Sequence, residues 1–211
     1  DATASGGWLP IDVQQLGADL LALAPHRFYG PKGAGVLYKN RRTRVENLIH
    51  GGMQENEFRA GTENVAAIVG AGVAAEDAEA ALGQAAAHAT GLQMRLLEGI
   101  HAAVEGVHLN GPKPGDGRLP HQLSLSTSGV EGEGQALMLD LWGVVIAAGA
   151  ACTTRSMRLP PALRAIGRDA DLARGTTLWS IGRDTTEEEI DQAVEAFAAV
   201  TAKLRAMSPA Q

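Results

Sequence analysis

Short apolar runs alternate along the chain with segments whose apolar residues recur at helical spacing, and polar turns lie between them. An apolar run bounded by turn residues is typical of a strand, whereas recurrence every three or four residues is typical of a helix. The runs predict strands over residues 20–24, 34–38, 122–126, 144–148 and 177–181. Helical spacing and helix-start residues predict helices over residues 10–17, 133–142, 159–166 and 185–207.

An alanine-rich segment over residues 63–104 also has apolar residues at helical spacing, and glycines such as Gly70 and Gly83 interrupt it. The glycines favour two helices with a bend over one straight helix. Thr62 or Gly61 is placed to cap the first of these helices, near residue 63.

The last predicted helix begins with a capping box made of Thr186 and Glu189. Strands that alternate with helices in this way indicate an α/β protein. Because the alanine-rich segment in the middle of the chain is suited to bridge two lobes, we place the domain division near residue 85. The predicted domains are therefore residues 1–85 and residues 86–211.

Charge and composition restrict the functions that this fold can have. The chain carries 18 Lys and Arg against 24 Asp and Glu, a net charge of −6, so we expect no nucleic-acid partner. Acidic residues such as Glu76 and Glu79 break the longest apolar stretches, so we expect no membrane span. Cys152 is the only cysteine, which excludes an internal disulfide and a cysteine-rich metal site and fits a cytoplasmic protein. Because the chain opens at Asp1 without a methionine, we take it as part of a longer polypeptide.

The densest candidate for chemistry is residues 24–35, Ala-Pro-His-Arg-Phe-Tyr-Gly-Pro-Lys-Gly-Ala-Gly. This segment resembles the cysteine desulfurases, class V aminotransferases of the fold-type-I group that depend on pyridoxal 5′-phosphate (PLP). In that family a strand ends in Ser-x-His-Lys and runs into Tyr-Gly-Pro-Lys-Gly, and the first lysine forms the Schiff base with PLP. Further matches follow in the family's order, at residues 1–3, 50–55, 59–64, 149–153 and 180–183.

The resemblance covers essentially the whole chain and implies the C-terminal portion of a fold-type-I PLP-dependent transferase. Residues 1–85 then form the remainder of the large PLP-binding domain and the start of the connecting helices. Residues 86–211 form the small C-terminal α/β domain that carries the cysteine loop. The first half of a family member, including the histidine that stacks on the pyridine ring, has no counterpart in this sequence.

The family's motifs assign roles to four residues. Asp1 falls on the carboxylate that keeps the pyridinium nitrogen of PLP protonated. His26 falls on a residue that lies beside the PLP phosphate. Thr62 falls on a threonine that reaches the PLP phosphate bound in the neighbouring subunit. Cys152 falls on the nucleophile that receives sulfur as a persulfide.

Each of these residues also has a structural explanation that the sequence leaves open. Asp1 is equally a solvated terminal charge, and His26 a structural histidine at the end of a strand. Helix capping explains Thr62 as well as phosphate binding does. A lone cysteine is commonly buried and inert, although the loop around Cys152 favours the nucleophile.

Arg27 is the main departure from the family, because it stands where the Schiff-base lysine belongs. A guanidinium stays protonated and does not replace a lysine amine in this role, so we expect no covalent attachment of PLP. Lys32 is an ordinary family residue of the Gly-Pro-Lys-Gly turn. Ala4 and Ala24 replace a glutamine and a serine that contact PLP, and Leu178 replaces the arginine that holds the substrate carboxylate.

The resemblance implies a cysteine desulfurase-like protein, which converts L-cysteine to alanine and an enzyme persulfide that donates sulfur for iron-sulfur cluster assembly or tRNA thiolation. Because of Arg27 and Leu178 we expect weak or absent activity. It further implies a homodimer and a sulfur-acceptor or scaffold protein as partner. Two alternatives remain open: a non-catalytic scaffold or sulfur acceptor that keeps Cys152, and a truncated, decayed gene product.

Overall fold

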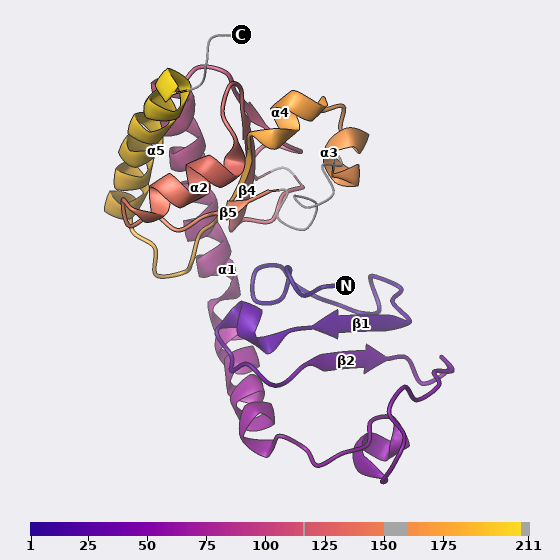
Figure 1. The fold of residues 1–211 in the computed structure, drawn as a ribbon. Coiled ribbons are helices and arrows are strands. Elements are labelled where there is room, and N and C mark those ends of the chain that lie inside the picture. The colour runs from indigo at the N-terminus through magenta and orange to yellow at the C-terminus, as the bar shows by residue number, and fades with distance from the viewer. Residues whose placement is uncertain (116, 150–159, 208–211) are drawn as a thin grey trace. The chain divides into compact units, whose positions relative to one another are not determined.

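The computed structural model of the chain describes residues 1–115, 117–149 and 160–207. The chain divides into two compact units, Asp1–Ala85 and Ala86–Gln211, and each contains its own antiparallel sheet (Figure 1). Within the described residues, no helix is long and apolar enough to span a membrane. Helices and strands mix in both units, which confirms the α/β class predicted from the sequence.

The first unit contains a two-stranded sheet made of β1 (Leu20–Leu23) and β2 (Val36–Lys39), in which Leu20 pairs with Lys39. Two short 3-10 helices, η1 (Pro25–Phe28) and η2 (Gln54–Glu57), lie in the loops that follow these strands. Both strands were predicted. The first half of a long helix packs against the turns of this unit. It buries Ala67, Ala71 and Ala74, and a Cβ added to Gly30 would lie 3.1 Å from the Ala74 methyl group.

The helix predicted over residues 10–17 is wrong. Residues 13–17 form turns, and the Asp12 carboxylate accepts hydrogen bonds from the backbone N–H groups of Gln14 and Gln15 at 2.8 and 3.2 Å. An aspartate that binds the backbone two and three residues on stabilises a turn, and Gly17 adopts a positive φ of 59° that ends any helical path.

The alanine-rich segment forms one helix, α1 (Val65–Ala103), and not two helices with a bend. Glycines lower helix stability without breaking a helix, and the many alanines around them favour it. The predicted cap is also wrong, because Asn64 stands at the helix start. Its side-chain oxygen accepts a hydrogen bond from the backbone N–H of Ala67 at 3.3 Å, whereas Thr62 lies further upstream.

The second unit is built on a four-stranded antiparallel sheet with the order β3-β4-β6-β5. Its strands are β3 (Val107–Leu109), β4 (Gln122–Thr127), β5 (Ala147–Ala148) and β6 (Thr176–Ser180). Its helices, besides the end of α1, are α2 (Gly132–Asp140), α3 (Pro161–Ala165), α4 (Ala170–Arg174) and α5 (Glu187–Met207).

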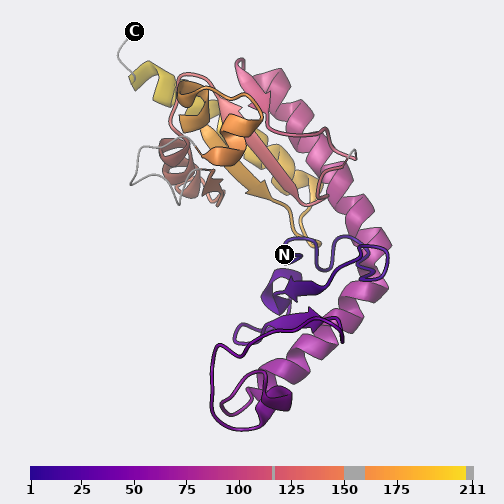
Figure 2. The same cartoon turned by 90° about the vertical axis from the view of Figure 1, so that its right-hand side faces the viewer.

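Helix α5 and the end of α1 cover one face of this sheet (Figures 1 and 2). The core lies between them. Leu123 and Leu125 of β4 are fully buried there with Phe197 of α5, and Trp179 of β6 meets the Phe197 ring edge-on at a centroid distance of 5.5 Å. Strand β4 therefore alternates between leucines that face the helices and serines on the other side.

Most elements of this unit were predicted, with shifted ends. The capping box at the start of α5 is confirmed: the backbone N–H of Thr186 donates to the Glu189 carboxylate at 2.9 Å, and that of Glu189 donates to the Thr186 hydroxyl at 3.2 Å. Strand β5 is shorter than the predicted residues 144–148, and β3 and α4 were not predicted.

Candidate functional site

The turn that carries His26 and Arg27 follows β1 directly. Pro25 begins η1, and Tyr29 ends it in the left-handed conformation, with φ at 67°. Pro25 and Phe28 are buried, so the two residues between them, His26 and Arg27, are presented to the surface. Phe28 packs against Gly6 and Gly7, since a Cβ added to Gly7 would lie only 2.7 Å from the Phe28 side chain.

Arg27 is exposed, and the described part of the chain provides no hydrogen-bond or ion-pair partner for its guanidinium. Its backbone N–H donates to the carbonyl of Ala24 at 2.9 Å, as the turn requires. A free guanidinium attracts anions, but it is not an amine that loses its proton near neutral pH. Position 27 therefore does not provide Schiff-base chemistry.

Asp1 lies beside the strand that leads into this turn. The backbone N–H of Ala2 donates to the carbonyl of Ala22 in β1 at 3.0 Å, and the Asp1 carboxylate accepts a hydrogen bond from the backbone N–H of Thr3 at 2.8 Å. The side chain is exposed. Asp1 and the His26 turn are thus placed along the same strand, although the role of each in PLP binding stays a prediction.

Thr62 is exposed, and it precedes α1 without capping it. Because Asn64 makes the capping hydrogen bond, helix capping no longer explains Thr62. Asn64 also donates a side-chain hydrogen bond to the carbonyl of Gly33 at 3.3 Å, which ties the start of α1 to the Pro31–Gly33 turn. The predicted contact of Thr62 with a phosphate in another subunit stays a prediction.

Leu178 lies in the middle of β6, directly opposite Ser124 of β4 and Ala147 of β5. It is half-buried on the face of the sheet turned away from the α1–α5 core. The nearest polar network on this face belongs to Asn110, whose amide donates to the hydroxyls of Ser124 and Ser126 at 3.2 and 2.8 Å.

Two arginines of this unit, Arg118 and Arg168, contact Asn110, and both are engaged in hydrogen bonds. Arg168 donates to the side-chain oxygen of Asn110 at 2.7 Å and to the carbonyl of Leu109 at 2.6 Å. Arg118 donates to backbone carbonyls that include that of Pro112 at 2.6 Å, and burial lowers its pKa. Both guanidinium groups are thus held by the protein itself, and the predicted role of position 178 in substrate binding stays a prediction.

The Asn110 network was not predicted. No motif or periodicity marks Asn110 in the sequence, since a buried asparagine at the end of a short strand has no distinctive pattern. Cys152, the predicted nucleophile, lies outside the described residues. The last described residue before it, Gly149, donates its backbone N–H to the carbonyl of Thr176 at 2.8 Å, so the chain approaches the cysteine motif alongside β6.

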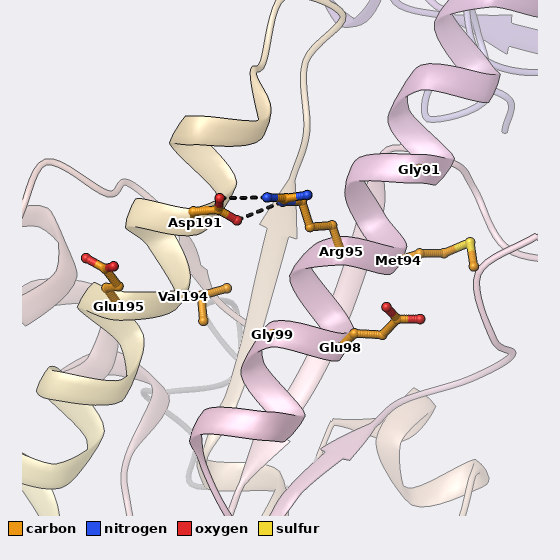
Figure 3. Close-up of a pocket in the computed structure, with 8 residues that line it drawn as sticks. All are labelled: Gly91, Met94, Arg95, Glu98, Gly99, Asp191, Val194 and Glu195. Carbon is orange, nitrogen blue, oxygen red and sulfur yellow. Dashed lines mark hydrogen bonds and ion pairs between the residues drawn. The ribbon is translucent and has the colours of Figure 1, made fainter.

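A shallow cleft of about 620 Å³ lies between α1 and α5 in the second unit (Figure 3). It contains none of the predicted site residues. Arg95 of α1 spans it to Asp191 of α5, and a further ion pair joins Arg95 to Glu187 at 3.0 Å. The described residues include no group of three or more His, Cys, Asp or Glu side chains that could hold a metal ion.

Comparisons with known proteins agree on one family. The aminotransferase class-V family model matches residues 1–193. The cysteine desulfurase IscS of Vibrio vulnificus is 44% identical over 211 residues, which cover 99% of this chain and 51% of the relative. That of Dictyoglomus turgidum is 40% identical over 209 residues, 99% of this chain and 52% of the relative. The chain thus spans about half the length of the curated relatives it matches.

Solved structures give the same result. A NifS-like protein is 31% identical, and its structure matches this chain with a TM-score of 0.85. The match covers 97% of this chain and 52% of the NifS-like chain. The structure of SspA in complex with cysteine is 30% identical and matches with a TM-score of 0.63. The match covers 88% of this chain and 50% of the SspA chain. The described fold is therefore that of one half of a larger family architecture.

This family depends on PLP, but the side chains present do not fit a covalently held PLP. Position 27 offers a guanidinium in place of an amine, and the half-buried Ala4 and Ala24 offer methyl groups where the family has polar contacts. Leu178 adds an apolar side chain where a carboxylate would be bound. The roles of these positions stay predictions, but the family is shown: the chain belongs to the aminotransferase class-V family, in which its curated relatives are cysteine desulfurases.

Proposed function

We propose that this chain is a cysteine desulfurase-like protein in which PLP-dependent removal of sulfur from L-cysteine is weak or absent. The observation that carries the proposal is Arg27, an exposed arginine in the η1 turn, at the position of the Schiff-base lysine. Loss of the amine removes covalent cofactor binding, and no side-chain rearrangement of a guanidinium restores it.

Lys32 is the nearest lysine in sequence, and it does not substitute for the missing amine. It lies beyond the left-handed Tyr29, in the Pro31–Gly33 turn. Pro31 packs so closely against α1 that a Cβ added to Gly70 would lie 2.9 Å from the proline ring. Asn64 holds the other end of this turn through the carbonyl of Gly33. The turn that bears Lys32 is thus fastened on both sides.

Substrate binding is weakened as well. A leucine at position 178 offers no hydrogen bond to a substrate carboxylate, and truncating one partner of a buried charge pair costs about 2–5 kcal/mol. Arg118 and Arg168 are held by backbone and by Asn110. Restoring the amine at residue 27 alone is therefore insufficient for full activity.

Absorbance spectra with added PLP test the proposal. The wild-type chain should form no Schiff-base band that borohydride reduction fixes to a lysine, and should release no alanine from L-cysteine. Arg27→Lys should bind PLP covalently at residue 27, as mapped by mass spectrometry, and Arg27→Lys with Leu178→Arg should bind cysteine more tightly. Lys32→Ala is the matched control and should leave the Arg27→Lys band unchanged. A reducible PLP adduct on a wild-type lysine, with alanine release, contradicts the proposal.

A second candidate function is that of a sulfur acceptor or scaffold. It is favoured by the cysteine motif at residues 149–153, which is kept although the cofactor and substrate contacts are lost. In this function the Cys152 thiolate attacks the outer sulfur of a persulfide on an active desulfurase. The S–S bond of the donor breaks, its thiolate leaves, and Cys152 carries the persulfide.

Mass spectrometry after incubation with an active desulfurase and L-cysteine distinguishes this function from the others. Persulfide on Cys152 only in the presence of the donor supports the acceptor function, and Cys152→Ser should abolish it. We further propose a homodimer in the cytoplasm, with a sulfur-acceptor or scaffold protein as partner, and sedimentation gives the first check. A chain that shows no cooperative unfolding would favour a decayed gene product instead.

A further inference from the structure

Thr176, the first residue of β6, holds the chain at the start of the cysteine motif. It is 2% exposed, and its carbonyl accepts a hydrogen bond from the backbone N–H of Gly149 at 2.8 Å. A Cβ added to Gly149 would overlap the Thr176 methyl group and lie 3.1 Å from the Thr176 Cβ. The φ of Gly149 lies outside the left-handed region, so crowding by Thr176, and not backbone conformation, requires glycine there.

A hydrogen bond from the neighbouring strand fixes the orientation of the Thr176 side chain. Thr176 lies opposite Ser126 of β4, and their hydroxyl oxygens are 2.7 Å apart. Ser126 is fully buried and also accepts a hydrogen bond from the Asn110 amide at 2.8 Å. The hydroxyl and the methyl group of threonine share one Cβ, so a fixed hydroxyl also fixes the methyl group. The methyl group that crowds Gly149 is therefore held in one orientation.

The backbone of Thr176 is enclosed as well. Gly132 begins α2 so close to it that an added Cβ would overlap the Thr176 carbonyl oxygen, the same atom that binds Gly149. A Cβ added to Gly175, the preceding residue, would overlap the carbonyl oxygen of Thr127. Packed interiors transmit strain and do not absorb it. A side chain at position 149 would therefore displace the chain that enters the cysteine motif, and not Thr176.

We propose that Thr176 is a positioning residue for Cys152: by fixing Gly149 it sets where the cysteine motif leaves the sheet, and with it the reactivity of the thiol. Only three residues separate Gly149 from Cys152, and three peptide units span at most about 11 Å. A displacement at Gly149 is therefore passed on to the cysteine. Displacements of about 1 Å are sufficient to change the rate of a reaction that depends on orientation.

This inference rests on the proposed function of Cys152 as the thiol that carries sulfur. It deepens that function, because it assigns control of the thiol to a buried residue of β6 that no motif marks. It does not depend on Arg27, on Leu178 or on PLP. Alkylation measures the thiol without any sulfur transfer, so the positioning and the sulfur-carrying function are tested separately.

The test is the rate at which iodoacetamide alkylates the chain, measured from pH 6 to pH 10 by mass spectrometry. Cys152 is the only cysteine, so no other thiol contributes. In Gly149→Ala we expect the rate at pH 7 to fall by about threefold or more, and the pH midpoint of the reaction to move by about half a unit or more toward that of a peptide of residues 147–157. Because only the thiolate reacts, a change in stability alone does not move this midpoint while the chain stays folded, as circular dichroism verifies.

A size exchange identifies Thr176 as the cause. Thr176→Ser removes the methyl group that crowds position 149 and keeps the hydroxyl that meets Ser126. Gly149→Ala combined with Thr176→Ser should therefore return the rate and the pH midpoint to within about twofold and a few tenths of a unit of wild type. The matched control is Gly134→Ala in α2, where an added Cβ meets a methyl group of Leu204 at an ordinary 3.5 Å and should change neither quantity.

Ser126→Ala provides a second test that adds no atoms, so it holds whether or not Gly149→Ala folds. It frees the Thr176 side chain, and we expect a fall in rate of about twofold or more with the same direction of pH shift. An unchanged rate and midpoint in both variants, or no recovery on adding Thr176→Ser to Gly149→Ala, overturns the positioning. Wild-type Cys152 that takes up no persulfide while the size exchange behaves as expected overturns the sulfur-carrying function and leaves the positioning in place.

Discussion

Arg95 of α1 holds the carboxylate of Asp191 of α5 by two hydrogen bonds, from Nε and from a terminal guanidinium nitrogen, each 2.7 Å long (Figure 3). The pair joins residues 96 positions apart in sequence and fastens the two helices that cover the sheet of the second unit. The hydrogen bonds from Arg95 lower the pKa of Asp191, and those to Asp191 raise the pKa of Arg95 above its usual range.

The lowered pKa of Asp191 predicts a stability change in acid. A carboxylate with a lower pKa in the folded state than in the unfolded state stabilises the fold above its unfolded pKa, roughly 4, and loses that contribution as pH falls through its folded pKa. Thermal unfolding of wild type and Asp191→Asn, followed by circular dichroism, should differ by a constant amount near neutral pH. The difference should shrink below about pH 4. Because both side chains are exposed, the effect is small, and an undiminished difference in acid contradicts the assignment.

The close approach of α1 and α5 depends on Gly99. A Cβ added there would lie 2.8 Å from a methyl group of Val194, whereas one added at Gly91, on the same helix, meets nothing within 4 Å. We expect Gly91→Ala to stabilise the protein by about 0.5–1 kcal/mol through helix propensity. Gly99→Ala should be less stable than Gly91→Ala by about 1–3 kcal/mol, because the helices must shift. Urea unfolding measures both, and equal stabilities would falsify the close packing.

The hydrogen bonds of Asn110 predict that its replacement lowers the free energy of unfolding. It is 5% exposed, accepts a hydrogen bond from Arg168 and donates two to Ser124 and Ser126. Asn110→Ala removes these three hydrogen bonds, while Arg168 keeps its bond to the carbonyl of Leu109 and Ser126 keeps its bond to the Thr176 hydroxyl. We expect a loss of about 1–3 kcal/mol in the free energy of unfolding. The control is His108→Ala, at an exposed position of β3 two residues before Asn110, and it should cost less than about 0.5 kcal/mol. A loss as small in Asn110→Ala as in the control contradicts the network.

The capping box of α5 gives a local prediction. Thr186→Ala removes the hydroxyl that accepts a hydrogen bond from the backbone N–H of Glu189, and we expect the free energy of unfolding to fall by about 0.5–2 kcal/mol. Thr186→Ser keeps the hydroxyl and should restore most of the loss. If serine is no better than alanine, the hydroxyl does not act as a cap, and the loss has another cause.

The sequence predicted the elements whose signals are local. Leu123 and Leu125 alternate with serines along β4, and this period was sufficient to predict the strand. Thr186 and Glu189 lie three residues apart, and this spacing was sufficient to predict the start of α5. The turn around Asp12 was mistaken for a helix because side-chain hydrogen bonds to the backbone decide its conformation. The unbroken α1 was mistaken for two helices because the glycines weigh less than the alanines around them.

The candidate site divides in the same way. Motifs in the sequence mark the positions of Arg27 and Leu178, and the structure adds their surroundings. Arg27 lies in the exposed η1 turn, and Leu178 lies in β6 opposite Ser124 of β4. Their roles, and those of Asp1, His26, Thr62 and Cys152, stay predictions. The hydrogen bond from Arg168 to Asn110 could not be predicted from the sequence. The two residues lie 58 positions apart, and no short-range pattern relates them. The assignment of residues 1–85 and 86–211 to a large and a small domain also stays a prediction.

The continuous helix α1 has a consequence for how the chain can be divided. The two units meet between Ala85 and Ala86, in mid-helix, where a backbone cut breaks the hydrogen bonds of a full turn and leaves unpaired N–H and C=O groups on both sides. A protease finds no extended linker there, and a gene truncated at this boundary encodes a helix with a frayed, uncapped start. Proteolysis at this boundary therefore requires local unfolding of α1.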